Sequence, residues 1–481
     1  MKPSAVPDLS RRRFIGQACC AAVGATGLLS SLASLRLIGA AASPGNGPVA
    51  SGATAPDYKA LVCLFLQGGN DANNLIIPYD PAGYAAYVAA RSSLLALPQA
   101  SVLPISPLTP DSVPGRTWAL HPSLAEFQSL FAAGKGALMA NVGTLAYPTT
   151  LAQYRTGSVP LPRQLYSHSD QQVQWESSIP DQAPTTGWGG RLADLVNAFN
   201  TNNQISMSIS LAGTNFFQVG QDVSQYSVSS SGTVTTFAGS TSSITSKDGI
   251  RYGAQKDLFA NPQAALFNTA FAGLSSSSIA NAVLLNTVLS GAPALTTVFP
   301  ATSLGNQLKT IAKLISTSAT FGLKRQIFFC QVGGYDLHSG QVDPANAAAG
   351  AHATLLQQLS QGLNAFYNAT VELGVANQVT TFTASDFGRT YSSNGNGTDH
   401  GWGNHQLILG GAVRGGDIYG RMPNLTINGP DDTGRGRWVP TTSVDEYAAT
   451  LATWFGVSVT DLPVVLPNIG RFAHPNLGFL G

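Results

Sequence analysis

Short apolar runs alternate along this chain with segments whose apolar residues recur at helical spacing. The predicted strands, rich in β-branched, aromatic and aliphatic side chains, cover residues 60–66, 136–143, 326–332, 379–383 and 405–413. The predicted helices cover residues 121–130, 310–323, 351–373 and 445–455. This alternation predicts an α/β fold, with a mostly parallel sheet sandwiched by helices.

Three of the predicted strands are followed by an aspartate. Asp71 and Asp336 each come after a strand and a pair of glycines, and Asp386 follows the strand at 379–383. Because open α/β sheets place their chemistry at the carboxyl ends of the strands, these carboxylates are expected at one edge. Asp71 alone would suggest the N-cap of the next segment. Three strands that end in acid favour a shared site.

Histidines gather in the same strand-end motifs. Four of the seven histidines do so, and His338 lies two residues beyond Asp336, so that in an extended segment both side chains point to the same face. Carboxylates and imidazoles are ligands of zinc and similar divalent ions, and two ions ~3.5–4 Å apart would need about six of them. The alternative is a polar loop capping the sheet. The predicted metal ligands are Asp71, Asp336, His338, Asp386, Asp399, His400 and His405.

A segment at 165–177 is dense in hydroxyl and ligand-type side chains. Ser167 precedes a predicted helix, where unpaired backbone N–H groups favour an attacking hydroxyl and a bound anion. The same serine could instead cap the helix, with Gln171 or Gln172 reaching back. We predict Ser167 and His168 as catalytic residues, with Arg389 as a clamp for the anion.

The first residues of the chain are typical of an export signal. Residues 10–15 read Ser-Arg-Arg-Arg-Phe-Ile, an Ala/Gly/Leu-rich span runs to Ile38, and three alanines precede Ser43. This stretch resembles a twin-arginine signal, which the export machinery would recognise. A membrane anchor is the alternative, but Arg36 and several small polar residues interrupt the apolar run. We predict a signal at 1–42, a linker at 43–58, and a periplasmic or secreted protein.

Composition limits the partners and the domain plan. Charged residues are 10% of the chain and the net charge is +1, so nothing favours nucleic acid as a partner. No later stretch is expected to be apolar for long enough to span a bilayer, and stable membrane insertion is not expected. The α/β domain covers 59–481, with a Ser/Thr-rich insertion or cap at about 200–300 that shapes the pocket.

Other patterns are absent or carry little chemistry. The sequence has no P-loop, no dinucleotide-binding glycine motif after a strand, and no HExxH motif. Cys63 and Cys330 lie in predicted strands and are expected to be buried free thiols. They could form a disulfide only if their strands were neighbours.

The strand-end motifs together resemble a known exported bacterial family. Gly68 to Asp71, Ser167-His168, Gly333 to His338, Ser385 to Thr390 and Gly397 to Gly401 resemble the family called domain of unknown function 1501. That family is similar to the alkaline phosphatase and sulfatase superfamily, an α/β/α sandwich with a two-metal site. The resemblance implies Asp71, Asp386 and His400 as ligands of one ion, Asp336 with His338 as ligands of the other, and Ser167 as nucleophile.

The sequence therefore predicts an exported hydrolase that depends on Zn, Mn, Mg or Ca. Its substrate would be a phosphate or sulfate ester, either a small anionic ester or a glycan. A formylglycine sulfatase is disfavoured, because neither Cys63 nor Cys330 lies in a Cys-x-Pro-Ser-Arg context. The alternative is a non-catalytic binding or surface-assembly protein. Phe387 favours it, because the superfamily commonly has a histidine at this position.

Overall fold

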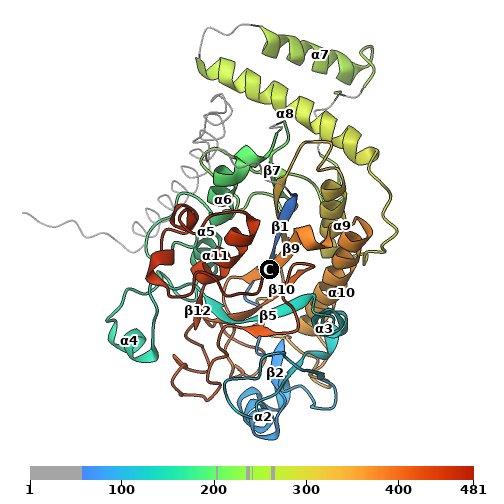
Figure 1. Cartoon of the computed structure of the whole chain (residues 1–481). Helices are drawn as coiled ribbons and strands as arrows, with labels where there is room; N and C mark the ends of the chain where they lie inside the picture. Colours follow the sequence, from blue (N-terminus) through green and yellow to red (C-terminus); the bar gives the residue numbers. More distant parts are fainter. Residues whose placement is uncertain (1–56, 202–203, 235–238, 241, 262–265) are drawn as a thin grey trace, which may run out of the picture. The chain divides into compact units, whose positions relative to one another are not determined.

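A computed structural model describes residues 57–481 except 202–203, 235–238, 241 and 262–265. The predicted signal at 1–42 and nearly all of the predicted linker lie outside these residues. The chain divides into two units, and the larger, residues 47–236 and 281–481, contains the central sheet (Figure 1).

The central sheet has nine strands and is mostly parallel, as the sequence predicts. Its order is β11-β5-β10-β9-β1-β8-β6-β7, with β12 also paired to β5. Only β10 runs antiparallel to its two neighbours, β9 and β5. The strands are β1 (Lys59–Leu66), β5 (Gly136–Gly143), β6 (Ser208–Ser210), β7 (Tyr226–Ser227), β8 (Arg325–Val332), β9 (Val379–Ser385), β10 (Asn404–Gly410), β11 (Ile418–Tyr419) and β12 (Thr442–Ser443).

Helices cover both faces of this sheet, which confirms the predicted sandwich (Figure 1). On one face α3 (Ala125–Ala132) and α9 (Ser303–Ser316) pack against α10 (Ala351–Glu372). The other face carries α5 (His168–Ser177), α6 (Trp188–Val196), α11 (Val444–Phe455) and α12 (Leu462–Val465). The remaining elements include α2 (Pro81–Leu95), α4 (Leu151–Thr156) and a small sheet of β2 (Ile76–Pro78), β3 (Leu103–Ile105) and β4 (Trp118–Leu120).

Helix α9 begins seven residues before the predicted helix at 310–323 and ends at Ser316. The Thr302 hydroxyl fixes its start, because it accepts a hydrogen bond from Gly305 N at 3.0 Å. The residues at 317–322 instead form turns. Periodicity alone did not locate this cap.

The register of the three central strands brings the loops that carry the predicted site residues to one edge of the sheet. Leu66, the last residue of β1, pairs with Val332 of β8 on one side and with Ser385 of β9 on the other. The three strands therefore end level with one another. The segments that follow them, beginning at residues 67, 333 and 386, start at the same edge of the sheet.

The predicted insertion at about 200–300 is partly built into the sheet. Strand β6 pairs with β8, and β7 extends the sheet beyond it. Residues 237–280 belong to the smaller unit, which holds α7 (Lys247–Ala260) and the start of α8 (Leu266–Ser290). Its predicted role as a cap over the pocket stays a prediction.

Part of α8, Phe271–Ser290, is long and apolar enough to cross a membrane by length and composition. This differs from the expectation that no later stretch would be long enough. Length and composition alone do not make it a membrane helix, because core helices of soluble proteins pass the same test.

The two cysteines are buried free thiols, as predicted. They lie on neighbouring strands, where Cys63 of β1 pairs in register with Phe329 of β8. The thiol of Cys330 faces the Cys63 carbonyl oxygen at 3.5 Å.

Candidate metal centre

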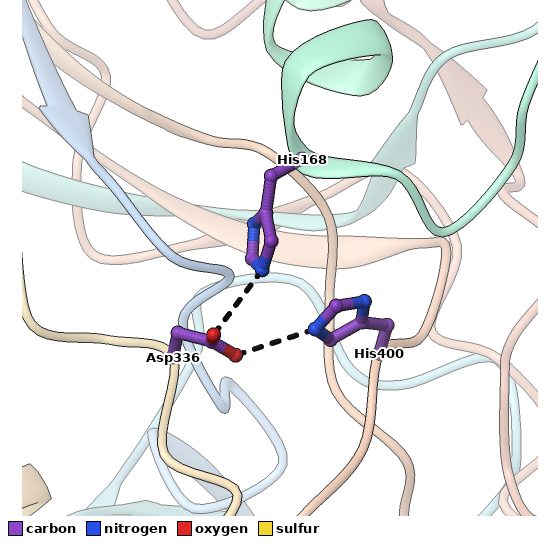
Figure 2. Close-up of side chains that lie close together, drawn as sticks. All are labelled: His168, Asp336 and His400. Atoms are coloured by element: carbon purple, nitrogen blue, oxygen red, sulfur yellow. Dashed lines mark hydrogen bonds and ion pairs between the residues drawn. The ribbon is translucent and has the colours of Figure 1, made fainter. Parts of the chain in front are cut away.

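Asp336 lies at the centre of a group of imidazoles at the carboxyl edge of the sheet. His168 and His400 approach its carboxylate from α5 and from the loop before β10 (Figure 2). Its Oδ2 lies 3.4 Å from His168 Nε2, and its Oδ1 lies 3.3 Å from His400 Nε2 and 3.2 Å from His338 Nε2. We call Asp336, His168, His338 and His400 the four-residue group.

Each of the three imidazoles is held through its Nδ1 by an oxygen acceptor. His168 Nδ1 donates to Asp386 Oδ2 at 2.6 Å, and His338 Nδ1 donates to Asp399 Oδ1 at 3.1 Å. His400 Nδ1 donates to the Tyr166 carbonyl oxygen at 2.7 Å. Carboxylate and carbonyl oxygens only accept, so the proton of each neutral ring must be on Nδ1.

This tautomer leaves three bare Nε2 atoms facing Asp336. His338 Nε2 and His400 Nε2 are 2.9 Å apart, so two lone pairs would face each other unless a proton or a metal ion lies between them. His168 Nε2 is buried and has no hydrogen-bond partner within the described residues. An unpaired buried acceptor beside three other donor atoms fits a bound metal ion.

The spacing of the donor atoms fits the same interpretation. A tetrahedral ion with bonds of about 2.0–2.1 Å needs ligand atoms about 3.3–3.4 Å apart. The separations of 3.2–3.4 Å between Asp336 and the imidazoles are close to this value, whereas the 2.9 Å between His338 Nε2 and His400 Nε2 is shorter. Histidines that donate their second nitrogen to a carboxylate or carbonyl are usual around protein-bound metals. The residues present therefore fit a divalent ion.

Arg389 holds the carboxylate of Asp336 in place through a hydrogen bond and charge. Its Nη1 donates to Asp336 Oδ1 at 2.7 Å and to the Gly68 carbonyl at 3.2 Å, and its Nε donates to Thr398 Oγ1 at 3.2 Å. Partial burial would raise the pKa of Asp336, but the hydrogen bond and charge of Arg389 outweigh it and lower that pKa. The Arg389 side chain is completely buried. It positions Asp336 and is not free to clamp a substrate.

The surroundings act differently on two of the imidazoles. The hydrogen bond to Asp386 raises the pKa of His168. Burial lowers the pKa of His400, although its bond to the Tyr166 carbonyl opposes this change.

Two glycines after β1 allow its loop to lie against the loops that follow β8 and β9. Gly68 has a φ of 114°, and a Cβ there would lie 2.4 Å from Asp336 N, so no side chain fits where the two loops meet. The Gly68 N–H then reaches both oxygens of Asp386, at 3.2 and 3.3 Å. Gly69 has a φ of 80°, and a Cβ there would lie 2.7 Å from the Phe387 ring.

Phe387 packs against two members of the four-residue group. Its ring centroid lies 4.7 Å from that of His168 and 4.6 Å from that of His400, and its side chain is buried. The aromatic ring therefore makes the surface of the group apolar where it contacts His168 and His400.

The structure brings together most of the predicted ligands, but it gives some of them other contacts. Asp386 and Asp399 contact the group through the Nδ1 atoms of His168 and His338. His168, predicted as catalytic, instead presents its Nε2 to Asp336 among the donor atoms.

Asp71 takes its hydrogen-bond and ion-pair partners from outside the four-residue group. It forms a buried ion pair with Arg91 and accepts a hydrogen bond from Gln341 Nε2 at 2.5 Å. Burial alone would raise its pKa, but the charge and hydrogen bond of Arg91 hold the pKa of Asp71 below its usual value. The short loop after β1 turns this side chain towards α2, although it leaves the same edge as Asp336.

His405 lies inside β10 and not in the loop before it. Its Nδ1 accepts a hydrogen bond from Asn141 N at 3.0 Å, and burial lowers its pKa to about 4. The strand begins at Asn404, so the fifth residue after His400 already points into the sheet. These contacts are those of a neutral core histidine.

Ser167 stands at the N-cap of α5, as predicted, but its hydroxyl does not cap the helix. It donates to Asp170 Oδ2 at 2.5 Å and lies 3.3 Å from Ser169 Oγ. The hydroxyl is therefore next to a carboxylate that could accept its proton.

Sequence reasoning did not identify the Tyr166 carbonyl as an anchor of the site. Tyr166 has a φ of 73°, a left-handed conformation that is uncommon for a residue with a side chain. The turn aims its carbonyl at His400 Nδ1. Strained backbone of this kind concentrates at functional sites.

Comparisons with known proteins give a family and distant structural similarities. The model of the family described as "Protein of unknown function (DUF1501)" matches residues 58–433. A search of the curated proteins finds no match.

Among solved structures, the PsFucS1 sulfatase from Pseudoalteromonas sp. is 10% identical, with a TM-score of 0.33, over 91% of this chain and 73% of that one. A variant of the alkaline phosphatase PafA is 11% identical, with a TM-score of 0.28, over 70% of this chain and 64% of that one. At this level of similarity neither match informs the activity of the chain.

Proposed function

Because this chain belongs to the DUF1501 family, whose description assigns no activity, we infer its function from the site: we propose an exported, metal-dependent hydrolase of a phosphate or sulfate ester. The twin-arginine motif at residues 10–15 supports export to the periplasm or beyond. The substrate would be a small anionic ester or an anionic glycan.

One observation carries the proposal: three imidazoles with their protons fixed on Nδ1 present bare Nε2 atoms to a single carboxylate. The 2.9 Å separation of His338 Nε2 and His400 Nε2 is part of it, because two bare nitrogens at that distance need a proton or a metal ion between them. Among the described residues, one group of three, His168, Asp336 and His400, brings its ligand atoms within 4.8 Å of one another, so we propose one ion and not the two that the sequence suggested.

The residues of the chain would divide the work as follows. Asp336, His168, His338 and His400 would hold the ion, and Asp386, Asp399 and the Tyr166 carbonyl keep the rings in the required tautomer. A divalent ion there, whether Zn, Mn, Mg or Ca, would polarise the ester oxygens and lower the pKa of a bound water or hydroxyl. Arg389 holds Asp336 in place through a buried hydrogen bond.

The attacking oxygen is that of Ser167 or of a bound water. Ser167 already donates its proton towards Asp170, an arrangement that suits a nucleophile and its base. Replacing Ser167 by alanine distinguishes attack by the serine oxygen from attack by a bound water. A loss of hydrolysis by two orders of magnitude or more with retained metal would assign the attack to Ser167, and retained hydrolysis would assign it to water.

A second candidate function is a non-catalytic binding or surface-assembly protein. Phe387 is the observation that favours it, because its ring fills the side of the site between His168 and His400 with carbon. Such a protein would bind metal but would turn over no ester.

The test is a screen of the purified mature protein against generic phosphate monoesters, phosphate diesters and sulfate esters. Each ester is offered with Zn, Mn, Mg or Ca after the metal content has been adjusted. Hydrolysis that His400→Ala abolishes would support the proposal. Full metal occupancy without hydrolysis of any ester class would favour the binding protein.

A further inference from the structure

Arg437 is a cation beside the four-residue group whose outer nitrogens are unused. Its Nε donates to the His400 carbonyl oxygen at 2.8 Å, and its guanidinium lies 4.9 Å from the centroid of the Tyr166 ring. Within the described part of the chain, its Nη1 and Nη2 donate to no acceptor and it joins no ion pair. The side chain is half-buried.

The other two arginines near the group are already occupied. Arg389 is buried and bound to Asp336, Gly68 and Thr398. Arg435 pairs with Asp399 and also donates to the Ser393 carbonyl oxygen. Arg437 is therefore the arginine here that can offer a pair of N–H groups to an external anion, a geometry suited to phosphate, sulfate and carboxylate.

Hydrogen bonds to one buried carboxylate hold the backbone of the loop that carries Arg437. Asp432 is buried, and its Oδ1 accepts hydrogen bonds from the backbone N–H groups of Gly434, Gly436 and Arg437 at 2.6, 2.8 and 3.1 Å. Stacking on Tyr166 further limits the rotamers of the arginine. A preorganised guanidinium loses little entropy when it binds an anion.

The position of Arg437 sets what it can recognise. Arg437 donates to the backbone carbonyl of His400 and stacks on the ring of Tyr166. The Tyr166 carbonyl in turn accepts the hydrogen bond from Nδ1 of the His400 imidazole. The Nε2 side of the ring faces Asp336. Arg437 thus lies beside the reacting centre and not in it.

We propose that Arg437 forms a second anion-binding subsite, which takes an acidic group of the substrate other than the ester that is cleaved. This inference rests on the proposed function and narrows the substrate class to esters with two anionic groups, such as a bisphosphate or a polysulfated sugar. Arg437 determines specificity, and a substrate with a single anionic group gains nothing from it.

The test compares the binding of fructose bisphosphate and fructose monophosphate to metal-loaded protein by titration calorimetry. The wild-type protein should bind the bisphosphate at least about ten times more tightly than the monophosphate. Arg437→Gln should remove that difference while monophosphate affinity and metal content stay unchanged. Arg437→Lys, which keeps the charge but not the planar pair of N–H groups, should retain part of the difference. Arg251→Gln, the same change on α7, should retain all of it.

Three results would overturn the subsite. One is equal affinity of the wild-type protein for the two sugars, and another is an unchanged preference in Arg437→Gln. The third is loss of metal from Arg437→Gln, which would make Arg437 a support for His400 alone. The binding assay does not need turnover. Absence of ester hydrolysis would contradict the proposed function without deciding the subsite.

Discussion

Asp386 donates no atom to the four-residue group, yet its Oδ2 accepts the Nδ1 proton of His168 at 2.6 Å and so decides which nitrogen of that ring is bare. The Asp386 side chain is fully buried and also accepts the Gly68 N–H. An aspartate at the end of a central strand thus controls a histidine from a separate helix.

We expect Asp386→Asn to weaken metal binding by about 10–100-fold, the usual cost of losing a partner that orients a metal-binding histidine. The amide can hydrogen-bond the ring but lacks the charge that fixes its tautomer. Titration of metal-free protein with zinc measures the change, and far-ultraviolet circular dichroism should stay native. Asp222→Asn, at an exposed aspartate, is the matched control. Unchanged affinity in Asp386→Asn would remove the proposed role of the Asp386–His168 pair.

His405→Leu should destabilise the protein without releasing metal. The change leaves the buried Asn141 N–H without an acceptor, which costs about 1–3 kcal/mol. Urea unfolding measures the loss of stability, and mass spectrometry measures metal in the folded fraction. Loss of metal with unchanged stability would return His405 to the ligand set.

Asp71→Asn should destabilise the fold more strongly, by about 3–5 kcal/mol, because it leaves the Arg91 charge buried and unpaired. The double variant Asp71→Leu with Arg91→Met removes both charges and should recover much of that loss. Urea unfolding of the three proteins measures both effects. A double variant no more stable than Asp71→Asn would argue against the ion pair as the cause.

Two buried carboxyl groups, those of Asp445 and Glu176, should each lower the unfolding free energy as pH rises from about 4 to 7. Buried neutral histidines such as His405 act in the opposite direction, because the unfolded chain protonates them and the folded chain does not. Burial raises the pKa of Asp445 from 3.8 to about 7. Burial likewise raises the pKa of Glu176 from 4.5 to about 7. Between these limits the folded state keeps a proton that the unfolded state has lost, so each group removes about 1.4 kcal/mol per pH unit.

Asp445→Asn should make the slope of the unfolding free energy against pH more positive, because the amide does not titrate and the negative contribution of Asp445 is lost. Urea unfolding at several pH values gives the slope for both proteins. An equal slope in the variant would show that Asp445 titrates normally in the folded state.

The apolar runs predicted the main strands and the parallel sheet, and the carboxylates after β8 and β9 were correctly expected at one edge. Strand ends are readable because an apolar run stops where the chain leaves the sheet. The direction of a side chain beyond that point is not readable from spacing. Asp71 and Asp336 both follow paired glycines, yet one turns to Arg91 and the other to three histidines.

The anchors of the site were harder to predict. The Tyr166 carbonyl contributes through a left-handed turn that no side chain signals. The charge of Arg389 suggested an anion clamp. Only tertiary contacts show that its guanidinium already donates to Thr398, Gly68 and Asp336. Arg437 lies far from the other motifs in sequence, and its unused nitrogens become visible only in the folded chain.

The central claim, that the four-residue group holds a divalent ion, is tested most directly by the metal content of purified protein. Inductively coupled plasma mass spectrometry should find close to one divalent ion per chain in the wild-type protein. The ion should be lost by an order of magnitude or more in His400→Ala and retained in His474→Ala, the matched change at an exposed histidine. Equal metal content in the wild-type protein and in His400→Ala would contradict the account.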